Sequence, residues 1–164
     1  MFQSMDTALT GPRAPLLLLL ASVIALGAAF VAQYGFDLQP CVLCLYQRWP
    51  YGVAIVLALA ALALPKYRGW LLALIGLTLL VDAGIAGYHV GVEQHWWAGT
   101  DACTGPDIKA KTLDQLRAQI MATPVTRCDE VAWSLFGISM AGYNFIACLV
   151  LAGFAFLAAK RAFS

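Results

Sequence analysis

Four apolar stretches separated by short polar ones dominate the hydrophobic pattern of the chain. Residues 14–36, 49–64 and 131–159 contain no charged side chain, and residues 69–92 contain only Asp82. A helix needs about 20 predominantly apolar residues to cross a lipid bilayer. The pattern therefore predicts four membrane-spanning helices, over approximately residues 15–35, 45–64, 69–92 and 140–159.

The polar segments predict two loops on the same side of the membrane, over approximately residues 36–44 and 93–139. Together with the four spans they form a single domain, residues 1–164. The first apolar stretch could instead be a secretory signal peptide. Its apolar run is longer than the roughly 7–15 residues of a typical signal core, so we expect an uncleaved span.

The long second loop contains a helical pattern of its own. Leu113, Leu116 and Ile120 recur at helical spacing, with charged residues at other positions. This pattern predicts a short amphipathic helix, which could lie on the membrane surface or pack on the rest of the loop. The expected fold class is thus an all-α membrane protein, a four-transmembrane-helix bundle with two outer loops.

The composition agrees with a membrane protein. Apolar residues make up 62% of the 164 residues and charged residues only 12%, against roughly 45–50% and 25% in soluble domains. A soluble fold of this size could not hide so much apolar surface, so lipid is the expected solvent. The net charge of +1 gives no reason to expect a nucleic-acid partner. A bundle of this length could function as a monomer, and we expect one.

Basic residues favour one orientation. The ten lysines and arginines divide equally between the two sides of the predicted membrane. Those on the side of the termini lie directly beside the ends of spans, where such residues influence topology most. This proximity predicts both termini inside and both loops outside; the basic residues in question are Arg13, Lys66, Arg68, Lys160 and Arg161.

The first loop carries the most distinctive motif, two cysteines at Cys41 and Cys44 followed by Arg48. If this segment is helical, Cys44 and Arg48 lie one turn apart on the same face. A neighbouring guanidinium favours the reactive thiolate over the thiol. Cysteines at this spacing can also close a small, reducible disulfide, so the motif predicts redox chemistry at the membrane surface.

The second loop carries another pair, Cys103 and Cys128. On a mobile loop these thiols could accept electrons from a soluble dithiol protein and pass them to Cys41 and Cys44 through mixed disulfides. Alternatively, they form an ordinary stabilising disulfide. Four cysteines allow three pairings, so the connectivity stays open. The sequence has only two histidines, and Cys103 and Cys128 lie far apart in it. Both features argue against a structural zinc site, so we expect no metal.

Electrons that reach Cys41 and Cys44 need an acceptor. The pair lies at the expected lipid interface, where a lipid-soluble quinone could meet it. The chain has no dinucleotide-binding fingerprint or P-loop, so a soluble nicotinamide cofactor is not expected. Arg48 could stabilise the negative charge that thiolate attack creates, or it could simply anchor the helix end at the interface.

These motifs resemble the DsbB family of bacterial disulfide bond formation proteins over nearly the whole chain. Pro40, Cys41, Cys44 and Arg48 match the core motif of that family, and Cys103 with Cys128 match its second cysteine pair. The order of four spans and two outer loops is also shared. The later residues that look similar are Asp129, Trp133, Gly137, Asn144 and Phe145.

The resemblance implies a quinone-dependent thiol oxidoreductase of the bacterial inner membrane, with periplasmic cysteine loops and cytoplasmic termini. It implies reoxidation of a DsbA-like periplasmic partner and transfer of the electrons to ubiquinone or menaquinone. The implied disulfides are Cys41–Cys44 and Cys103–Cys128. In the family, the equivalent of Cys103 forms the mixed disulfide with the partner. The equivalent of Cys44 makes the charge-transfer contact with quinone, supported by that of Arg48.

Four further residues have weaker predictions. His89, at the outer end of the third span, could bind a quinone carbonyl or shuttle protons, or it could be an ordinary interfacial histidine. Glu93 could also move protons or be merely solvated. Asp82 is costly in lipid and therefore a functional candidate. We expect a structural role instead, in which Asp82 is protonated or hydrogen-bonded, with Asn144 as a candidate partner. Cys148 is expected to be a small packing residue.

Two other functions compete with this one. A vitamin-K-epoxide-reductase-like enzyme also combines a Cys-x-x-Cys motif with loop cysteines, but in the reverse order along the chain. A membrane scaffold stapled by two disulfides would bind no quinone. In a scaffold, Arg48 beside a small cysteine ring would have no purpose.

Overall fold

The computed structural model describes residues 11–100, 103, 112–115, 117 and 126–163. Its four long helices are each long and apolar enough to cross a membrane. This confirms the predicted all-α, four-helix membrane bundle. The helices are α2 (Arg13–Gly35), α3 (Val42–Ala63), α4 (Arg68–Glu93) and α7 (Met140–Phe163), and the short 3₁₀ helix η1 (Pro65–Tyr67) joins α3 to α4.

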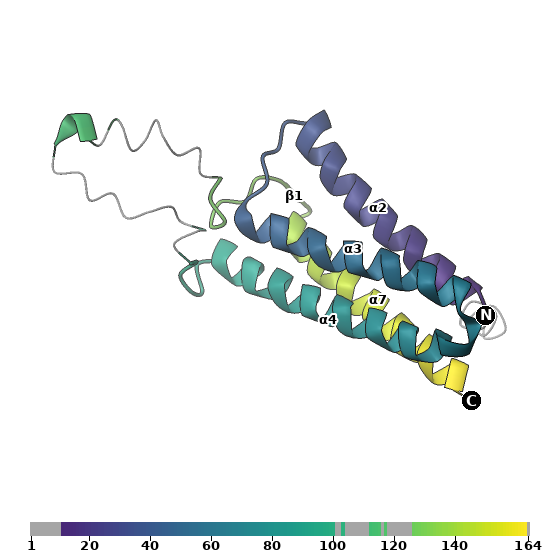
Figure 1. Cartoon of the computed structure of the whole chain (residues 1–164). Coiled ribbons are helices and arrows are strands. Elements are labelled where there is room, and N and C mark those ends of the chain that lie inside the picture. The colour runs from purple at the N-terminus through teal and green to yellow at the C-terminus, as the bar shows by residue number, and fades with distance from the viewer. Residues whose placement is uncertain (1–10, 101–102, 104–111, 116, 118–125, 164) are drawn as a thin grey trace.

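Both cysteine pairs lie at one end of the bundle. Helix α2 begins and α7 ends at the same end, and the segments that carry the cysteine pairs emerge at the opposite end (Figure 1). Helix α3 already begins at Val42, earlier than the apolar pattern suggested, so Cys44 lies inside the helix. The predicted amphipathic helix falls largely outside the described residues.

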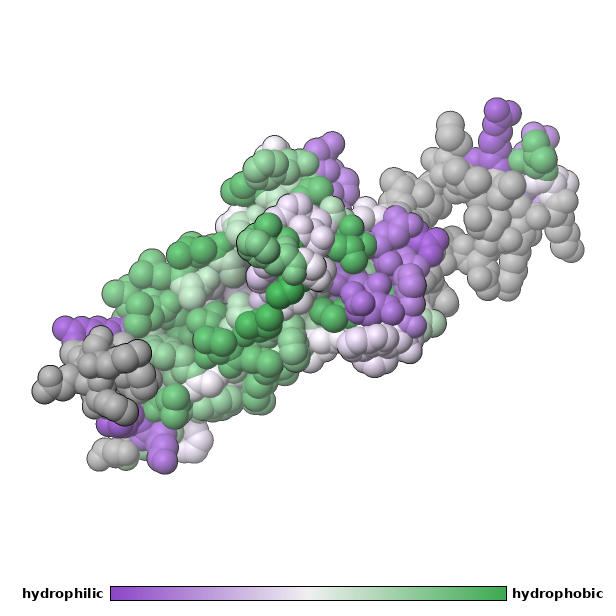
Figure 2. Space-filling model, turned by 180° about the vertical axis from the view of Figure 1, so that it is seen from behind, coloured by the Kyte–Doolittle hydropathy of each residue, from purple (hydrophilic) through white to green (hydrophobic). Residues whose placement is uncertain are grey.

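The outer surface of the bundle is apolar. Large side chains such as Ile24, Val56 and Val150 are about two-thirds exposed. Figure 2 shows a broad hydrophobic surface along the helices, with hydrophilic residues concentrated at the two ends. A surface of this kind is stable only in contact with lipid.

Small residues allow the helices to pack closely, as is common in membrane bundles. Ala58, Ala83 and Ala155 are fully or almost fully buried in the core. Helix α4 packs extensively on α7 and α3, whereas α2 packs mainly on α3 and has little contact with α7. The resulting separation of α2 from α7 leaves space for a cavity at the cysteine end.

A short β-hairpin, not predicted from the sequence, leads into α7. Strands β1 (Ser134–Leu135) and β2 (Ile138–Ser139) pair antiparallel. The two residues between them, Phe136 and Gly137, both have positive φ, at 51° and 78°. Two such residues are typical of a tight hairpin turn, and glycine adopts this conformation without strain. The hairpin brings the chain from Cys128 back to the start of the fourth span.

Two aromatic side chains, Tyr88 and Trp97, pack together at the end of α4. The indole Nε1 of Trp97 donates to the carbonyl of Tyr88 at 3.1 Å, and the two rings stack with centroids 5.9 Å apart. The Trp97 ring lies directly over Gly91, where an added Cβ would come within 1.9 Å of it. Glycine at this position therefore permits the path that the chain takes from α4 toward Cys103.

We expect Gly91→Ala to lower stability by about 1–3 kcal/mol, the usual cost of overpacking, because the indole must move. Gly84→Ala is the matched control on the same helix, since nothing lies within 4 Å of an added Cβ there. That control should be neutral or stabilising, because alanine favours helix. Thermal unfolding in detergent measures both variants, and equal unfolding temperatures would contradict the packing described for Trp97.

Candidate redox centre and adjoining cavity

Cys41 and Cys44 form the first turn of α3. Cys41 is the N-cap residue, and its Sγ accepts a hydrogen bond from the backbone N–H of Cys44 at 3.3 Å. The sulfur therefore does the work of the serine or aspartate oxygen that usually caps a helix. The two Sγ atoms are 2.8 Å apart. Hydrogen bonding to Cys44 and burial raise the pKa of the Cys41 thiol to about 12, so the reduced Cys41 keeps its proton at neutral pH.

Cys103 and Cys128 are buried against this turn rather than carried on a free loop. Both side chains have no exposed surface, and they pack in one cluster with Cys41, Leu43 and Val92. The backbone N–H of Cys128 donates to the carbonyl of Cys103 at 3.0 Å. Burial, and after it the hydrogen bond with Cys103, raise the pKa of the Cys128 thiol. The structure thus joins two pairs that are distant in sequence, all of them as free thiols.

His89 connects the two pairs. The Sγ atoms of Cys41 and Cys128 and a ring nitrogen of His89 all lie within 4.8 Å of one another. Cysteine and histidine are the residue types that commonly bind zinc. The reduced centre therefore brings together three potential zinc ligands that are far apart in the sequence, which their spacing did not predict. The same proximity is what thiol–disulfide exchange between Cys128 and Cys41 requires.

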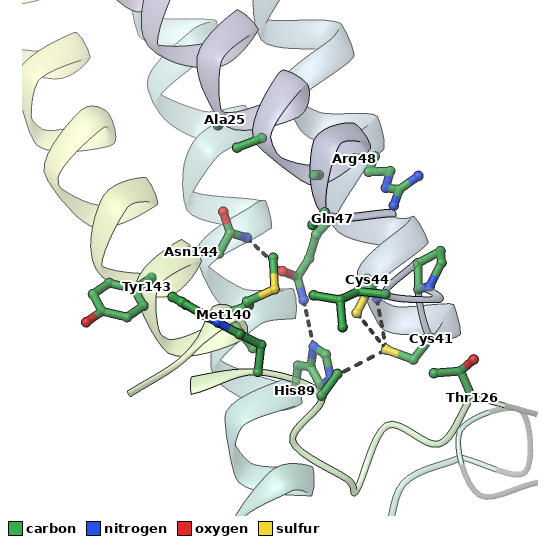
Figure 3. A pocket seen from close by; sticks show the side chains of 18 of the residues that line it. Ala25, Cys41, Cys44, Gln47, Arg48, His89, Thr126, Met140, Tyr143 and Asn144 are labelled. Atoms are coloured by element: carbon green, nitrogen blue, oxygen red, sulfur yellow. Dashed lines mark hydrogen bonds between the residues drawn. The ribbon is translucent and has the colours of Figure 1, made fainter. Parts of the chain in front are cut away.

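A chain of hydrogen bonds leads from His89 into the bundle (Figure 3). Nε2 of His89 lies 3.5 Å from Cys41 Sγ, and Nδ1 lies 3.0 Å from Nε2 of Gln47. The Oε1 atom of Gln47 accepts from Nδ2 of Asn144 at 2.8 Å. Asn144 in turn accepts from the hydroxyl of Tyr51 at 2.6 Å. Three different helices therefore fix the position of His89.

Glu93 lies one turn beyond His89 and is not a solvated surface residue. Its side chain is only 6% exposed, and its Oε1 is 3.9 Å from Nε2 of His89. Its other oxygen accepts a hydrogen bond from Ser139 of the hairpin. Glu93 therefore ties the end of α4 to the start of α7 and places a carboxylate beside the histidine.

Arg48 faces α2. Its Nη1 donates to Oε1 of Gln33 at 2.7 Å, and its guanidinium lies 5.0 Å from the centroid of the Phe30 ring. Its Nε is buried and has no hydrogen-bond partner among the described residues. A buried, unpaired N–H is costly, so this donor is suited to a ligand.

A cavity of about 470 Å³ adjoins Cys44 and Arg48 (Figure 3). This volume is within the range of about 300–1,000 Å³ typical of small-molecule sites. Helix α2 contributes small apolar side chains to its wall, among them Ala25, Ala29 and Ala32. Polar groups in the lining include Cys41, Cys44, Gln47, Arg48, His89, Glu93 and Asn144.

The cavity has the properties that a quinone ring would need. Its walls are largely apolar, both Cys41 and Cys44 line it, and the unpaired N–H of Arg48 could donate to a carbonyl oxygen. The buried Asp82 lies deeper, where its Oδ2 accepts from Asn144 at 3.5 Å and from Cys148 at 3.2 Å. The pairing of Asp82 with Asn144 agrees with the sequence-based expectation.

Sequence reasoning missed Gln33 and Gln47, and it named Asn144 only as a partner of Asp82 and as a residue similar to the family. Gln33, Gln47 and Asn144 occur in or beside apolar spans, where a polar amide needs a partner. That rule alone could have singled them out. Their partners depend on how the helices pack, which no spacing in the sequence specifies.

Comparison with known proteins identifies the family. The family model described as "Disulfide bond formation protein DsbB" matches residues 12–158. Disulfide bond formation protein B of Hahella chejuensis is 33% identical over 129 residues, covering 74% of this chain and 77% of the Hahella protein. Disulfide bond formation protein B 2 of Pseudomonas savastanoi is 33% identical over 141 residues, covering 78% and 76%.

A protein of Rickettsia prowazekii, described as uncharacterized, is also similar, at 32% identity over 135 residues, covering 80% of this chain and 77% of its own. No solved structure matches the chain significantly. The family model covers most of the chain, including both cysteine pairs and all four helices. This multi-pass membrane protein, a disulfide oxidoreductase, belongs to the DsbB family of disulfide bond formation proteins.

Proposed function

We propose that this protein reoxidises a DsbA-like dithiol protein and passes the electrons to ubiquinone or menaquinone. One observation carries the proposal. Cys41 lies beside Cys128, while Cys44, its partner across one helical turn, lines the cavity. A route of neighbouring sulfur atoms therefore leads from the outer loop to a site that is open to a lipid-soluble acceptor.

The first steps take place at the outer pair, which starts as a Cys103–Cys128 disulfide. Cys103 has no exposed surface in the described structure, so it must first become accessible. A thiolate of the partner protein then attacks Cys103 and forms a mixed disulfide, and Cys128 leaves as a thiolate. Cys128 then attacks Cys41 of the Cys41–Cys44 disulfide, so that Cys44 leaves as a thiolate beside the cavity. Each step exchanges one sulfur–sulfur bond for another.

Two resolving steps complete the exchange. The second thiol of the partner attacks its own mixed-disulfide sulfur and releases Cys103, so the partner leaves oxidised. Cys103 then attacks Cys128 of the Cys41–Cys128 disulfide, which restores the Cys103–Cys128 bond and releases Cys41. Two electrons and two protons have now moved from the partner to Cys41 and Cys44.

The final step reoxidises the α3 pair. A quinone bound in the cavity would supply the two-electron oxidation and take up two protons as quinol. The protein contributes Cys44 at the cavity wall, the donor Nε–H of Arg48, and Cys41, which holds its proton until Cys44 has reacted. Closure of the Cys41–Cys44 disulfide returns the protein to its starting state.

The location follows from the same chemistry. We place the protein in the bacterial inner membrane, with both termini cytoplasmic and both cysteine segments periplasmic. An oxidising compartment is where disulfides persist. The basic residues beside the opposite helix ends support this orientation.

We expect the purified protein in detergent to reduce added ubiquinone or menaquinone when a reduced DsbA-like protein supplies electrons. Cys44→Ser and Cys103→Ser should each abolish turnover, because each removes a sulfur that the route requires. Cys148→Ala is the matched control, since this thiol lies outside both the cluster and the cavity lining. The absorbance of the quinone follows the reaction.

Failure of the folded wild-type protein to reduce any quinone would sink the proposed enzyme and leave a disulfide-stapled scaffold. Equal loss of turnover in Cys148→Ala would show that the variants act through general damage to the fold rather than through the sulfur route. Circular dichroism and gel filtration of each variant separate these two cases.

A second prediction concerns the proton on Cys41. Cys44→Ala should bring the pKa of Cys41 down from about 12 toward its usual 9.0, because the hydrogen bond to Cys44 is the largest cause of the rise. His89→Ala should act in the opposite direction, since the contact with His89 lowers this pKa. The midpoint of the pH dependence of iodoacetamide labelling at Cys41, read by mass spectrometry, measures both shifts. An unchanged midpoint in Cys44→Ala would contradict this account.

A further inference from the structure

Asp82 is a buried carboxylate that the redox steps do not use. It lies in α4 with no exposed surface. Its Oδ2 accepts from Asn144 Nδ2 and Cys148 Sγ, and its Oδ1 has no partner among the described residues. An acidic side chain inside a membrane span is costly and usually functional. The contacts of Asn144 show where that function could act.

Asn144 links Asp82 to the redox centre. Its Oδ1 accepts from Tyr51, while its Nδ2 donates to both Asp82 and Gln47. Gln47 then contacts Nδ1 of His89 with its own Nε2. Three side chains, those of Asn144, Gln47 and His89, thus connect the carboxylate to Cys41 through four successive contacts.

The carboxylate sets the donor-to-acceptor direction of this chain of hydrogen bonds. Asn and Gln amides each have a donor end and an acceptor end, and a Tyr hydroxyl can play either part. Such a chain could therefore run in either sense. The ionised carboxylate of Asp82 can only accept, so its Oδ2 requires the NH₂ group of Asn144 on its side. The same NH₂ group then meets the carbonyl of Gln47, and the NH₂ group of Gln47 is left to face His89.

A donor facing Nδ1 decides the tautomer of His89. A neutral imidazole carries one proton, and Nδ1 must accept from Gln47, so the proton resides on Nε2. Nε2 is faced by Cys41 Sγ at 3.5 Å and by Glu93 Oε1 at 3.9 Å, and Cys128 Sγ belongs to the same cluster. All of these groups can accept from an N–H. These groups are compatible with the Nε2–H form, and the direction of the hydrogen-bond chain selects it.

We propose that Asp82 is a positioning residue which, through Asn144 and Gln47, holds His89 with its Nε2–H directed at Cys41. In that position the N–H stabilises negative charge on the Cys41 sulfur when Cys103 releases it from Cys128. This use of the N–H rests on the proposed function, whereas the tautomer itself does not.

The test reads the tautomer directly. The chain has only two histidines, His89 and His95, so ¹⁵N-histidine labelling gives a simple NMR spectrum, and His95→Gln assigns the signals. In the reduced, detergent-solubilised protein, at a pH where both imidazoles are neutral, we expect His89 to have a protonated Nε2 and an unprotonated Nδ1. In Asp82→Asn the new amide can donate as well as accept, so His89 should become a mixture of both tautomers.

Two further variants complete the experiment. Asn144→Ala removes the link and should give the same mixture, and it decides the matter if Asp82→Asn does not fold. Cys148→Ala removes the other partner of Asp82 Oδ2 but leaves the chain to His89 intact, so it should keep the wild-type tautomer. A wild-type His89 with its proton on Nδ1, or an unchanged Nε2–H form in both Asp82→Asn and Asn144→Ala, would overturn the proposal. Neither partner nor quinone is needed, so failure of the proposed electron route would leave this result standing.

Discussion

The site depends on how the N-terminus of α3 is capped. A cysteine sulfur accepts the N–H of Cys44 in place of the usual side-chain oxygen, so the redox pair is also the start of a membrane-spanning helix. This holds the two Sγ atoms 2.8 Å apart at the wall of the cavity. Cys41 also lies beside the buried Cys128 and His89. A disulfide in this turn therefore borders both the second cysteine pair and the cavity.

The bundle combines an apolar outer surface with polar residues buried in its interior. The helices expose their apolar side chains outward, so the buried polar residues must find partners within the bundle. They do so in one connected network from Asp82 through Asn144 and Gln47 to His89. The loose packing of α2 against α7 has the opposite result, since it leaves an apolar cavity beside the thiols. The hydrogen-bond network thus holds His89 in place, while the cavity leaves free space next to Cys44.

Much of the fold could be predicted because a bilayer imposes a simple length rule on apolar segments. Local spacing also singled out Cys41, Cys44 and Arg48 as candidates, and the start of α3 brings all three to the wall of one cavity. The burial of Cys103 and Cys128 against α3 was not predictable, because no spacing in the sequence places them against Leu43 and Val92. The roles of Gln33 and Gln47 were equally hidden, since each is defined by a partner on another helix. The hairpin at Phe136 and Gly137 has too few residues to show a strand pattern.

The central claim is that the two cysteine pairs form one redox centre through Cys41 and Cys128. It is tested most directly in a Cys44→Ser, Cys103→Ser double variant, which leaves only these two thiols in the cluster. Mild oxidation followed by proteolysis and mass spectrometry would show which cysteines have joined. The account predicts rapid formation of an intramolecular Cys41–Cys128 disulfide, with Cys148 still free. Cysteines that stay reduced, or that pair only between molecules, would contradict it.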